Sequence, residues 1–230
     1  MGIIGVVAAL TLPNLNSSTG DKEKVTKLQK TYASLEDAYG RALAVYGPVT
    51  TWFSNDTCSN GGGNTVTNNA CAKRFGDRLT EFMRVSKNCG VLRSGGECFA
   101  NTDVKFLNNT KAQNPMDTFS CYKFITADNV SMCINFWTKN FTSDANGTVG
   151  NAGADIHIDL DGPNKGANTY GKDFFQFIVT QDAIIPHGRN HCEDVFTKGL
   201  CAADWIIEYG NMDYLKCPSE LSWETKTSCK

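Results

Sequence analysis

The chain has 230 residues, 41% of them hydrophobic, so a core can form and the composition excludes a disordered protein. Lysine and arginine total 22 against 24 acidic residues, and this balance argues against a nucleic-acid partner. The ten cysteines show no C-x-x-C spacing, so the sequence predicts disulfides formed in an oxidising compartment and not metal-binding cysteine pairs.

The first predicted element is an uncharged segment, GIIGVVAALTL, at residues 2–12. As a helix it would reach about 16 Å, roughly half of a bilayer core. A signal-peptide core has this length, although no basic residue precedes it and no small-x-small cleavage site follows. A buried core helix is another interpretation, but it leaves the cysteines unexplained. The candidate membrane or filament helix consists of Gly2, Ile3, Ile4, Gly5, Val6, Val7, Ala8, Ala9, Leu10, Leu12 and Pro13.

An amphipathic helix is predicted next, after a polar break at residues 16–21. Its apolar residues are alternately three and four positions apart, which indicates one face packed on a core. Gly47-Pro48 should end it, and Pro13 with the polar break predicts a bend between the two helix halves. The apolar stripe consists of Val25, Leu28, Tyr32, Leu35, Tyr39, Ala42 and Tyr46.

The remainder reads as a globular α+β head. The chain therefore divides into an apolar helix half at 1–19, an amphipathic half at 20–47 and the head at 48–230. Glycine, asparagine and alternating β-branched residues predict surface loops and antiparallel strands. The expected fold class is α+β, with a long N-terminal helix packed on an antiparallel sheet and a loop-rich head stapled by disulfides. Its predicted elements are a loop at 50–70, a helix at 71–85, a hairpin of 118–127 and 130–137 turning at Asp128-Asn129, strands at 154–160 and 173–180, and a turn at Pro186.

The segment GIIGVVAALTLPNL resembles the N-terminal helix of type IV pilins and type II secretion pseudopilins, through Gly5, Ala8-Ala9 and Pro13. The stretches at 155–188 and 201–223 look like the C-terminal part of pilin-like proteins from anaerobic and gut bacteria. In that family about ten further residues come first, with a basic leader, a cleavage site before a methylated aromatic residue, and a glutamate. None of these is present, so we expect the sequence to be truncated ahead of Met1.

The resemblance implies a structural subunit of a type IV pilus-like or pseudopilus filament, with a minor or large-headed pilin favoured. Its partners would be copies of itself or related pilins, joined through the N-terminal helix. It would be anchored in the inner membrane before assembly, with a periplasmic or extracellular head, and would then stand in a cell-surface filament. The alternatives are an adhesin-like binding module at a filament tip and, less favoured, a secreted enzyme with a truncated signal peptide.

One candidate metal site lies around an acidic turn. Asp159, Asp161 and Asp173, with Asn164 and Asn168, offer the oxygen ligands that calcium prefers, and some pseudopilins that this chain resembles bind calcium near the C-terminus. Acids crowded at one strand end with few basic partners would gain from a cation. The favoured alternative is an Asx-turn around Gly162-Pro163, in which the side chains accept hydrogen bonds from their own backbone.

The sequence offers few other candidates for a metal site or a catalytic site. Zinc held by His187, His191 and Cys192 is conceivable, but in an oxidising compartment we favour a disulfide for Cys192. No G-x-S-x-G, cysteine-histidine or P-loop signature occurs, so we expect no enzyme and no cofactor other than calcium.

The cysteines are expected to pair locally, with Cys89–Cys98 and Cys192–Cys201 as the most plausible bonds. A two-residue turn at Asp128-Asn129 would place Cys121 and Cys133 on opposite faces of the hairpin, so the sequence does not predict that pair. The candidates are Cys58, Cys71, Cys89, Cys98, Cys121, Cys133, Cys192, Cys201, Cys217 and Cys229.

Overall fold

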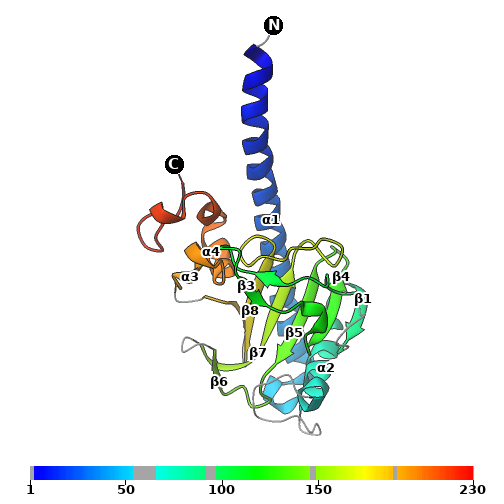
Figure 1. Ribbon diagram of the computed structural model, residues 1–230. Helices are drawn as coiled ribbons and strands as arrows, with labels where there is room; N and C mark the ends of the chain where they lie inside the picture. Colours follow the sequence, from blue (N-terminus) through cyan, green and yellow to red (C-terminus); the bar gives the residue numbers. More distant parts are fainter. Residues whose placement is uncertain (1–2, 54–65, 92–96, 146–148, 189–190, 230) are drawn as a thin grey trace.

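A computed structural model describes residues 3–53, 66–91, 97–145, 149–188 and 191–229, with the backbone alone at 3–18, 66–69, 144–145 and 149. The chain is α+β, as the sequence predicts. A 44-residue helix, α1 (Ile3–Tyr46), runs along one antiparallel sheet and extends well beyond it (Figure 1). At 1.5 Å per residue α1 is about 66 Å long.

The sheet has seven strands in the order β1-β4-β5-β7-β8-β9, with β6 pairing to the far end of β7. All of its pairings are antiparallel. A two-stranded sheet of β2 and β3 lies apart from it in the hydrogen-bonding order. The strands are β1 (Val85–Gly90), β2 (Val104–Lys105), β3 (Lys111–Gln113), β4 (Tyr122–Thr126), β5 (Ser131–Phe136), β6 (Ser143–Ala145), β7 (Val149–Asp159), β8 (Phe174–Thr180) and β9 (Ile184–Pro186).

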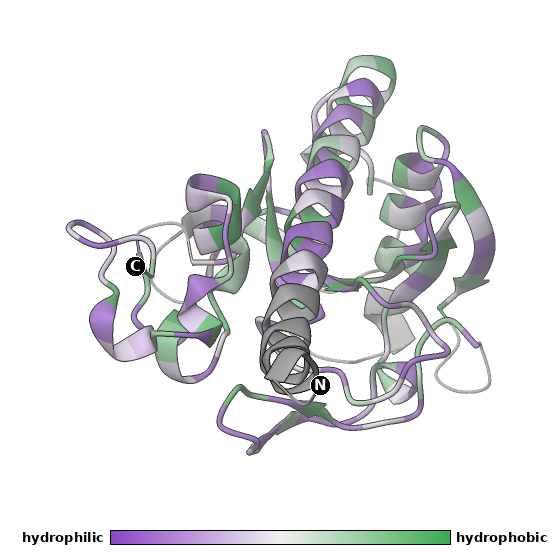
Figure 2. Cartoon of the chain, turned by 90° about the horizontal axis from the view of Figure 1, so that it is seen from above, coloured by the Kyte–Doolittle hydropathy of each residue, from purple (hydrophilic) through white to green (hydrophobic). Residues whose placement is uncertain are grey.

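Shorter helices flank α1 on both sides. Seen from above, α1 lies between α2 (Val66–Thr80) and the C-terminal segment that contains α4 (Ala202–Tyr209), and it contacts both helices (Figure 2). The C-terminal segment also holds α3 (Asp194–Thr197) and packs its aromatic rings around the buried Trp205. The 3-10 turns are η1 (Val49–Thr51), η2 (Met116–Thr118), η3 (Asp213–Leu215) and η4 (Pro218–Glu220).

The second half of α1 forms the main core with one face of the sheet. Leu28, Leu35 and Ala42 are fully buried, which confirms the predicted stripe. Tyr32 stacks on Phe177 of β8 with ring centroids 5.2 Å apart, and its hydroxyl donates to the carbonyl of Ile184 at 3.2 Å. The helix ends at Tyr46, directly before Gly47-Pro48, as predicted.

The polar segment at 16–21 does not interrupt the backbone of this helix. α1 continues through residues 16–21, and Pro13 does not end it. One glycine costs a helix interior about 1 kcal/mol, whereas propagating a helix that is already nucleated adds one hydrogen bond per residue. The helical turns on either side therefore outweigh the weak formers between them.

The predicted hairpin of β4 and β5 is present, but its register differs by one residue. Ile125 lies opposite Ser131, and the Val130 carbonyl accepts a hydrogen bond from the Thr126 amide at 3.0 Å. The loop therefore has three residues, and Asn129 has a φ of 56°, the left-handed residue that such loops need. This register puts Cys121 and Cys133 on the same face, where they form a disulfide.

Three further boundaries depart from the prediction. The second helix begins at Val66 and ends at Thr80, instead of spanning 71–85, so part of the predicted loop at 50–70 is helical; residues 54–65 lie outside the described residues. Pro186 belongs to the short strand β9, and the turn follows it. Proline is tolerated there because β9 is at the edge of the sheet.

Four disulfides join described cysteines, which confirms the stapled head. The two local pairs that the sequence predicts, Cys89–Cys98 and Cys192–Cys201, are both formed. Cys217–Cys229 joins Cys229 to the residue directly before η4, and Cys121–Cys133 corrects the sequence prediction. Cys71 is also disulfide-bonded, and Cys58 lies outside the described residues.

Candidate functional site

The acidic turn after β7 is built mainly by backbone hydrogen bonds to its own carboxylates. Oδ1 of Asp159 accepts the amide of Asp161 at 2.9 Å and that of Gly162 at 3.2 Å. Oδ1 of Asp173 accepts the amide of Thr169 at 2.6 Å. The turn thus has the Asx geometry that the sequence analysis favoured.

Lysines from α1 reach this turn from more than 130 positions away in the chain. The ammonium of Lys27 donates to the carbonyl of Leu160 at 2.5 Å, and Asp161 and Asp159 lie close enough to favour its charge. Burial raises the pKa of Asp173 overall, and the charge of Lys24 partly opposes that shift. The assumption that these acids have few basic partners is therefore wrong, because sequence distance says nothing about which helix face lies above the turn.

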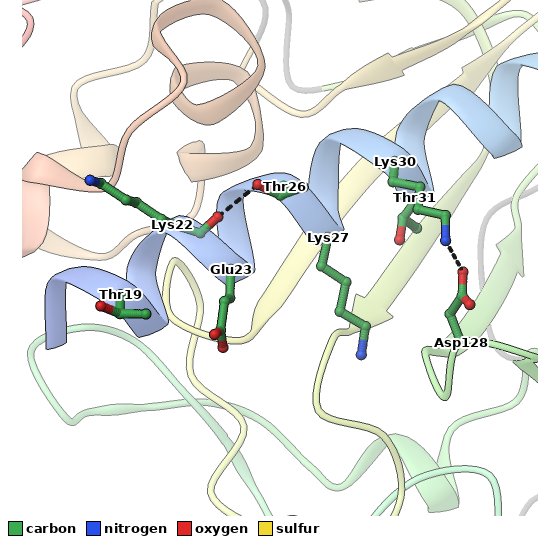
Figure 3. Close-up of a pocket in the computed structure, with 8 residues that line it drawn as sticks. All are labelled: Thr19, Lys22, Glu23, Thr26, Lys27, Lys30, Thr31 and Asp128. Carbon is green, nitrogen blue, oxygen red and sulfur yellow. Dashed lines mark hydrogen bonds and ion pairs between the residues drawn. The ribbon is translucent and has the colours of Figure 1, made fainter. Parts of the chain in front are cut away.

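A shallow cavity of about 420 Å³ opens along this part of α1 (Figure 3). Lys30 crosses one end of it and pairs with Asp128 of the β4–β5 loop at 2.8 Å. The side chain of Lys27 points down from the helix beside it, as Figure 3 shows. The remaining lining residues are Thr19, Lys22, Glu23, Thr26 and Thr31.

Burial shifts the proton affinities in this region. It raises the pKa of Asp159 to about 7, because the carboxylate is fully buried and two amide donors only partly offset its desolvation. Burial also raises the pKa of Asp173 and lowers the pKa of Lys27.

The proposed calcium ligands are only partly assembled. Among the described residues, Asp159, Asp161 and Asp173 do not form a cluster of converging ligand atoms. Asn164 lines a different groove, together with Asn129 and Lys87. Asn168 is 1% exposed, and its side-chain amide nitrogen has no hydrogen-bond partner among the described residues. Calcium binding here stays a prediction.

A second polar group lies buried on the opposite face of the sheet from α1. Asp155 of β7 accepts from the side-chain amide of Gln176 at 2.6 Å and pairs with Nε2 of His157 at 2.9 Å. The hydroxyl of Tyr170 lies 3.4 Å from Nδ1 of His157. Both Asp155 and His157 are buried, so this group joins strands and does not open to solvent.

The three residues of the conceivable zinc site are not brought together as ligands. Cys192 is in a disulfide with Cys201, and Nδ1 of the buried His187 lies 3.8 Å from the Cys201 sulfur. His191 contacts a different residue, because its Nε2 is 3.1 Å from Oε2 of Glu208 on α4. The sequence analysis missed this contact, although Asp204 and Glu208 have the four-residue spacing that places two carboxylates on one helix face.

The candidate filament helix, Gly2 to Leu10 with Leu12 and Pro13, coincides from Ile3 on with the first part of α1. From Ile3 their backbone is helical, and their side chains lie outside the described residues. No helix in the described part of the chain combines the length and apolar character that crossing a bilayer requires. Comparison with protein-family models, with curated proteins and with solved structures finds no match to this chain.

Proposed function

We propose that the chain is a structural subunit of a type IV pilus-like or pseudopilus-like filament, in which α1 packs against α1 of neighbouring copies and the head faces outward. The observation that carries this proposal is that the two halves of α1 differ in their contact with the head. Its second half is covered by the sheet, whereas its first half extends beyond the sheet (Figure 1).

The burial of α1 side chains by the head begins near the middle of the helix. Among the residues of α1 whose side chains the structure describes, from Thr19 on, Val25 is the first buried position, and Lys22 and Glu23 before it are exposed. The uncharged sequence at 2–12 therefore precedes the part of the helix that the head protects. A contiguous apolar surface needs a partner, either lipid or other protein.

Copies of the same helix suit that role. Gly2, Gly5, Ala8 and Ala9 are small, and small residues let helix backbones approach closely. Identical subunits related by a rotation that does not close produce an open helical filament. In this proposal the apolar segment is held by the inner membrane before assembly and by its neighbours afterwards.

The test compares the full chain with a variant that lacks residues 1–19. The deletion should give a soluble monomer with the same melting temperature and circular-dichroism signature of tertiary structure. The full chain should partition into detergent or membrane and form oligomers when detergent is diluted. If the deletion unfolds the head, the segment is a core helix and the proposal fails.

A matched pair of substitutions sharpens this test. Val7→Lys places a charge in the apolar segment and should abolish detergent binding and oligomers without changing the melting temperature. Val45→Lys places the same charge on the same helix, at a position 62% exposed within the head, and should leave association intact. Equal effects of both variants would contradict the proposal.

A further inference from the structure

Three potential metal ligands converge beside α4, away from the acidic turn. One imidazole nitrogen of His191 and one carboxylate oxygen each of Asp204 and Glu208 lie within 4.8 Å of one another. Asp204 and Glu208 are four residues apart on α4, so both project from the same face of that helix. We propose that these three residues bind a divalent transition-metal ion, with zinc as the metal that their donors fit best.

The imidazole of His191 is held in place by its surroundings. Its ring stacks on Trp223 with centroids 4.6 Å apart and planes 5° from parallel. Trp223 is fixed in turn, because its indole nitrogen donates to the Cys192 carbonyl at 3.2 Å and its own carbonyl accepts the Tyr209 hydroxyl at 2.6 Å. A ligand whose ring is already oriented loses little conformational entropy when a metal binds.

A disulfide connects the two parts of the site covalently. Cys192 directly follows His191, Cys201 directly precedes α4, and the two are bonded to each other. The loop that carries the imidazole is therefore tied to the first turn of the helix that carries both carboxylates. This explains how a histidine 13 positions before Asp204 comes to face it.

The donor set favours zinc over calcium or magnesium. Calcium and magnesium take oxygen ligands, whereas an imidazole nitrogen with carboxylate oxygens suits zinc, which binds three protein ligands and leaves a fourth position for water. The cluster borders a cavity of about 670 Å³ that can admit such a water. Glu36 of α1 also lines it, and none of the described lining residues is lysine or arginine.

The experiment measures zinc binding to the full chain, purified without a polyhistidine tag and with its disulfides intact. Calorimetry with zinc chloride should give one site per chain. His191→Ala and Glu208→Gln should each weaken it at least tenfold. Glu193→Gln removes the same type of charge from an exposed residue two positions from His191 and should leave the affinity unchanged.

X-ray absorption of the zinc-loaded chain identifies the donors directly. The expected spectrum has nitrogen and oxygen neighbours near 2.0–2.1 Å and no sulfur. Unchanged affinity in both ligand variants, equal weakening by Glu193→Gln, sulfur in the coordination shell, or calcium binding in place of zinc would each overturn the proposal. Glu208 is 43% exposed, so its glutamine variant should fold even if the His191 variant does not. None of these outcomes bears on the filament.

Discussion

The two faces of β7 are equally buried but are built on different chemistry. On the face toward α1, Ile156 and Ile158 are fully buried in the main apolar core. On the other face, Asp155 and His157 are 3% and 4% exposed, and they lie among hydrogen-bonding partners. Alternation along a strand therefore tells which residues share a face, but it does not tell whether a polar face meets water.

Substitutions on the two faces should also lower the free energy of unfolding for different reasons. An apolar face is stabilised by the area it removes from water, and it loses free energy roughly in proportion to the atoms deleted. A buried polar face contributes little net stability when satisfied, yet it costs free energy when one partner is removed. Single substitutions on each face can therefore separate these two responses.

The largest effect is expected on the apolar face. Phe177→Ala removes a fully buried ring that stacks on Tyr32 and should lower the free energy of unfolding by about 3–5 kcal/mol. Urea unfolding of the disulfide-intact chain measures it. Val45→Ala, at an exposed position of α1, serves as the control and should change stability by no more than about 0.5 kcal/mol. A loss below about 1 kcal/mol for Phe177→Ala would mean that α1 does not pack on β8 as described.

A smaller effect is expected on the polar face from a nearly isosteric change. Asp155→Asn keeps the shape, but His157 and Gln176 both contact one oxygen of Asp155, so the amide NH₂ must replace the other oxygen, which is buried without a hydrogen-bond partner among the described residues. We expect a loss of about 1–3 kcal/mol in the free energy of unfolding. The proton of His157 should show altered exchange in NMR spectra. If Asp155→Asn is neutral, the buried carboxylate is not needed by His157 and Gln176, and the contrast between the two faces disappears.

The pH dependence of stability tests the same face at Asp159. Its pKa is about 7 in the folded chain, above the ordinary aspartate value. The folded state therefore holds a proton that the unfolded state has released, so stability should fall as pH rises from about 4 to about 7, by up to about 1.4 kcal/mol per unit. Asp159→Asn should reduce this slope and leave only the part that comes from Asp173, whose pKa burial also raises. Asp161→Asn makes the same change on a half-buried neighbour and should retain it.

Much of the fold follows from patterns that are local in the sequence. The apolar spacing from Val25 to Tyr46 specifies the covered half of α1, and Gly47-Pro48 specifies its end. Alternation specifies β7 and β8, and short separation specifies the Cys89–Cys98 and Cys192–Cys201 disulfides. Each of these features depends on residues within a few turns or one loop of each other.

What the sequence did not yield depends on contacts between distant segments. Lys27 lies beside Asp161 only because α1 crosses the end of β7, and nothing in either segment indicates it. The one-residue error in the hairpin arose because Asp128-Asn129 suits a two-residue turn, whereas Asn129 in the left-handed conformation allows a three-residue loop. His191 meets Glu208 because a disulfide and Trp223 hold its loop, which spacing alone cannot show.

The smallest effect is expected for an exposed ion pair that lies on neither face of β7. Lys30 pairs with Asp128 at 2.8 Å, but the two side chains are 70% and 60% exposed. Solvent screens such a pair, so a double-mutant cycle of Lys30→Ala and Asp128→Ala should give a coupling of about 0–1 kcal/mol that shrinks further in 1 M salt.

Lys27→Met provides the contrast on the same helix, because the Lys27 ammonium donates to the Leu160 carbonyl beside the buried acids. It should change stability by more than Lys30→Ala, and that difference should persist in 1 M salt, since a partly buried interaction is screened less. Equal changes for the two lysines would show that burial does not determine how much a polar group contributes to the free energy of unfolding of this head. The difference between its polar and apolar faces would then need another explanation.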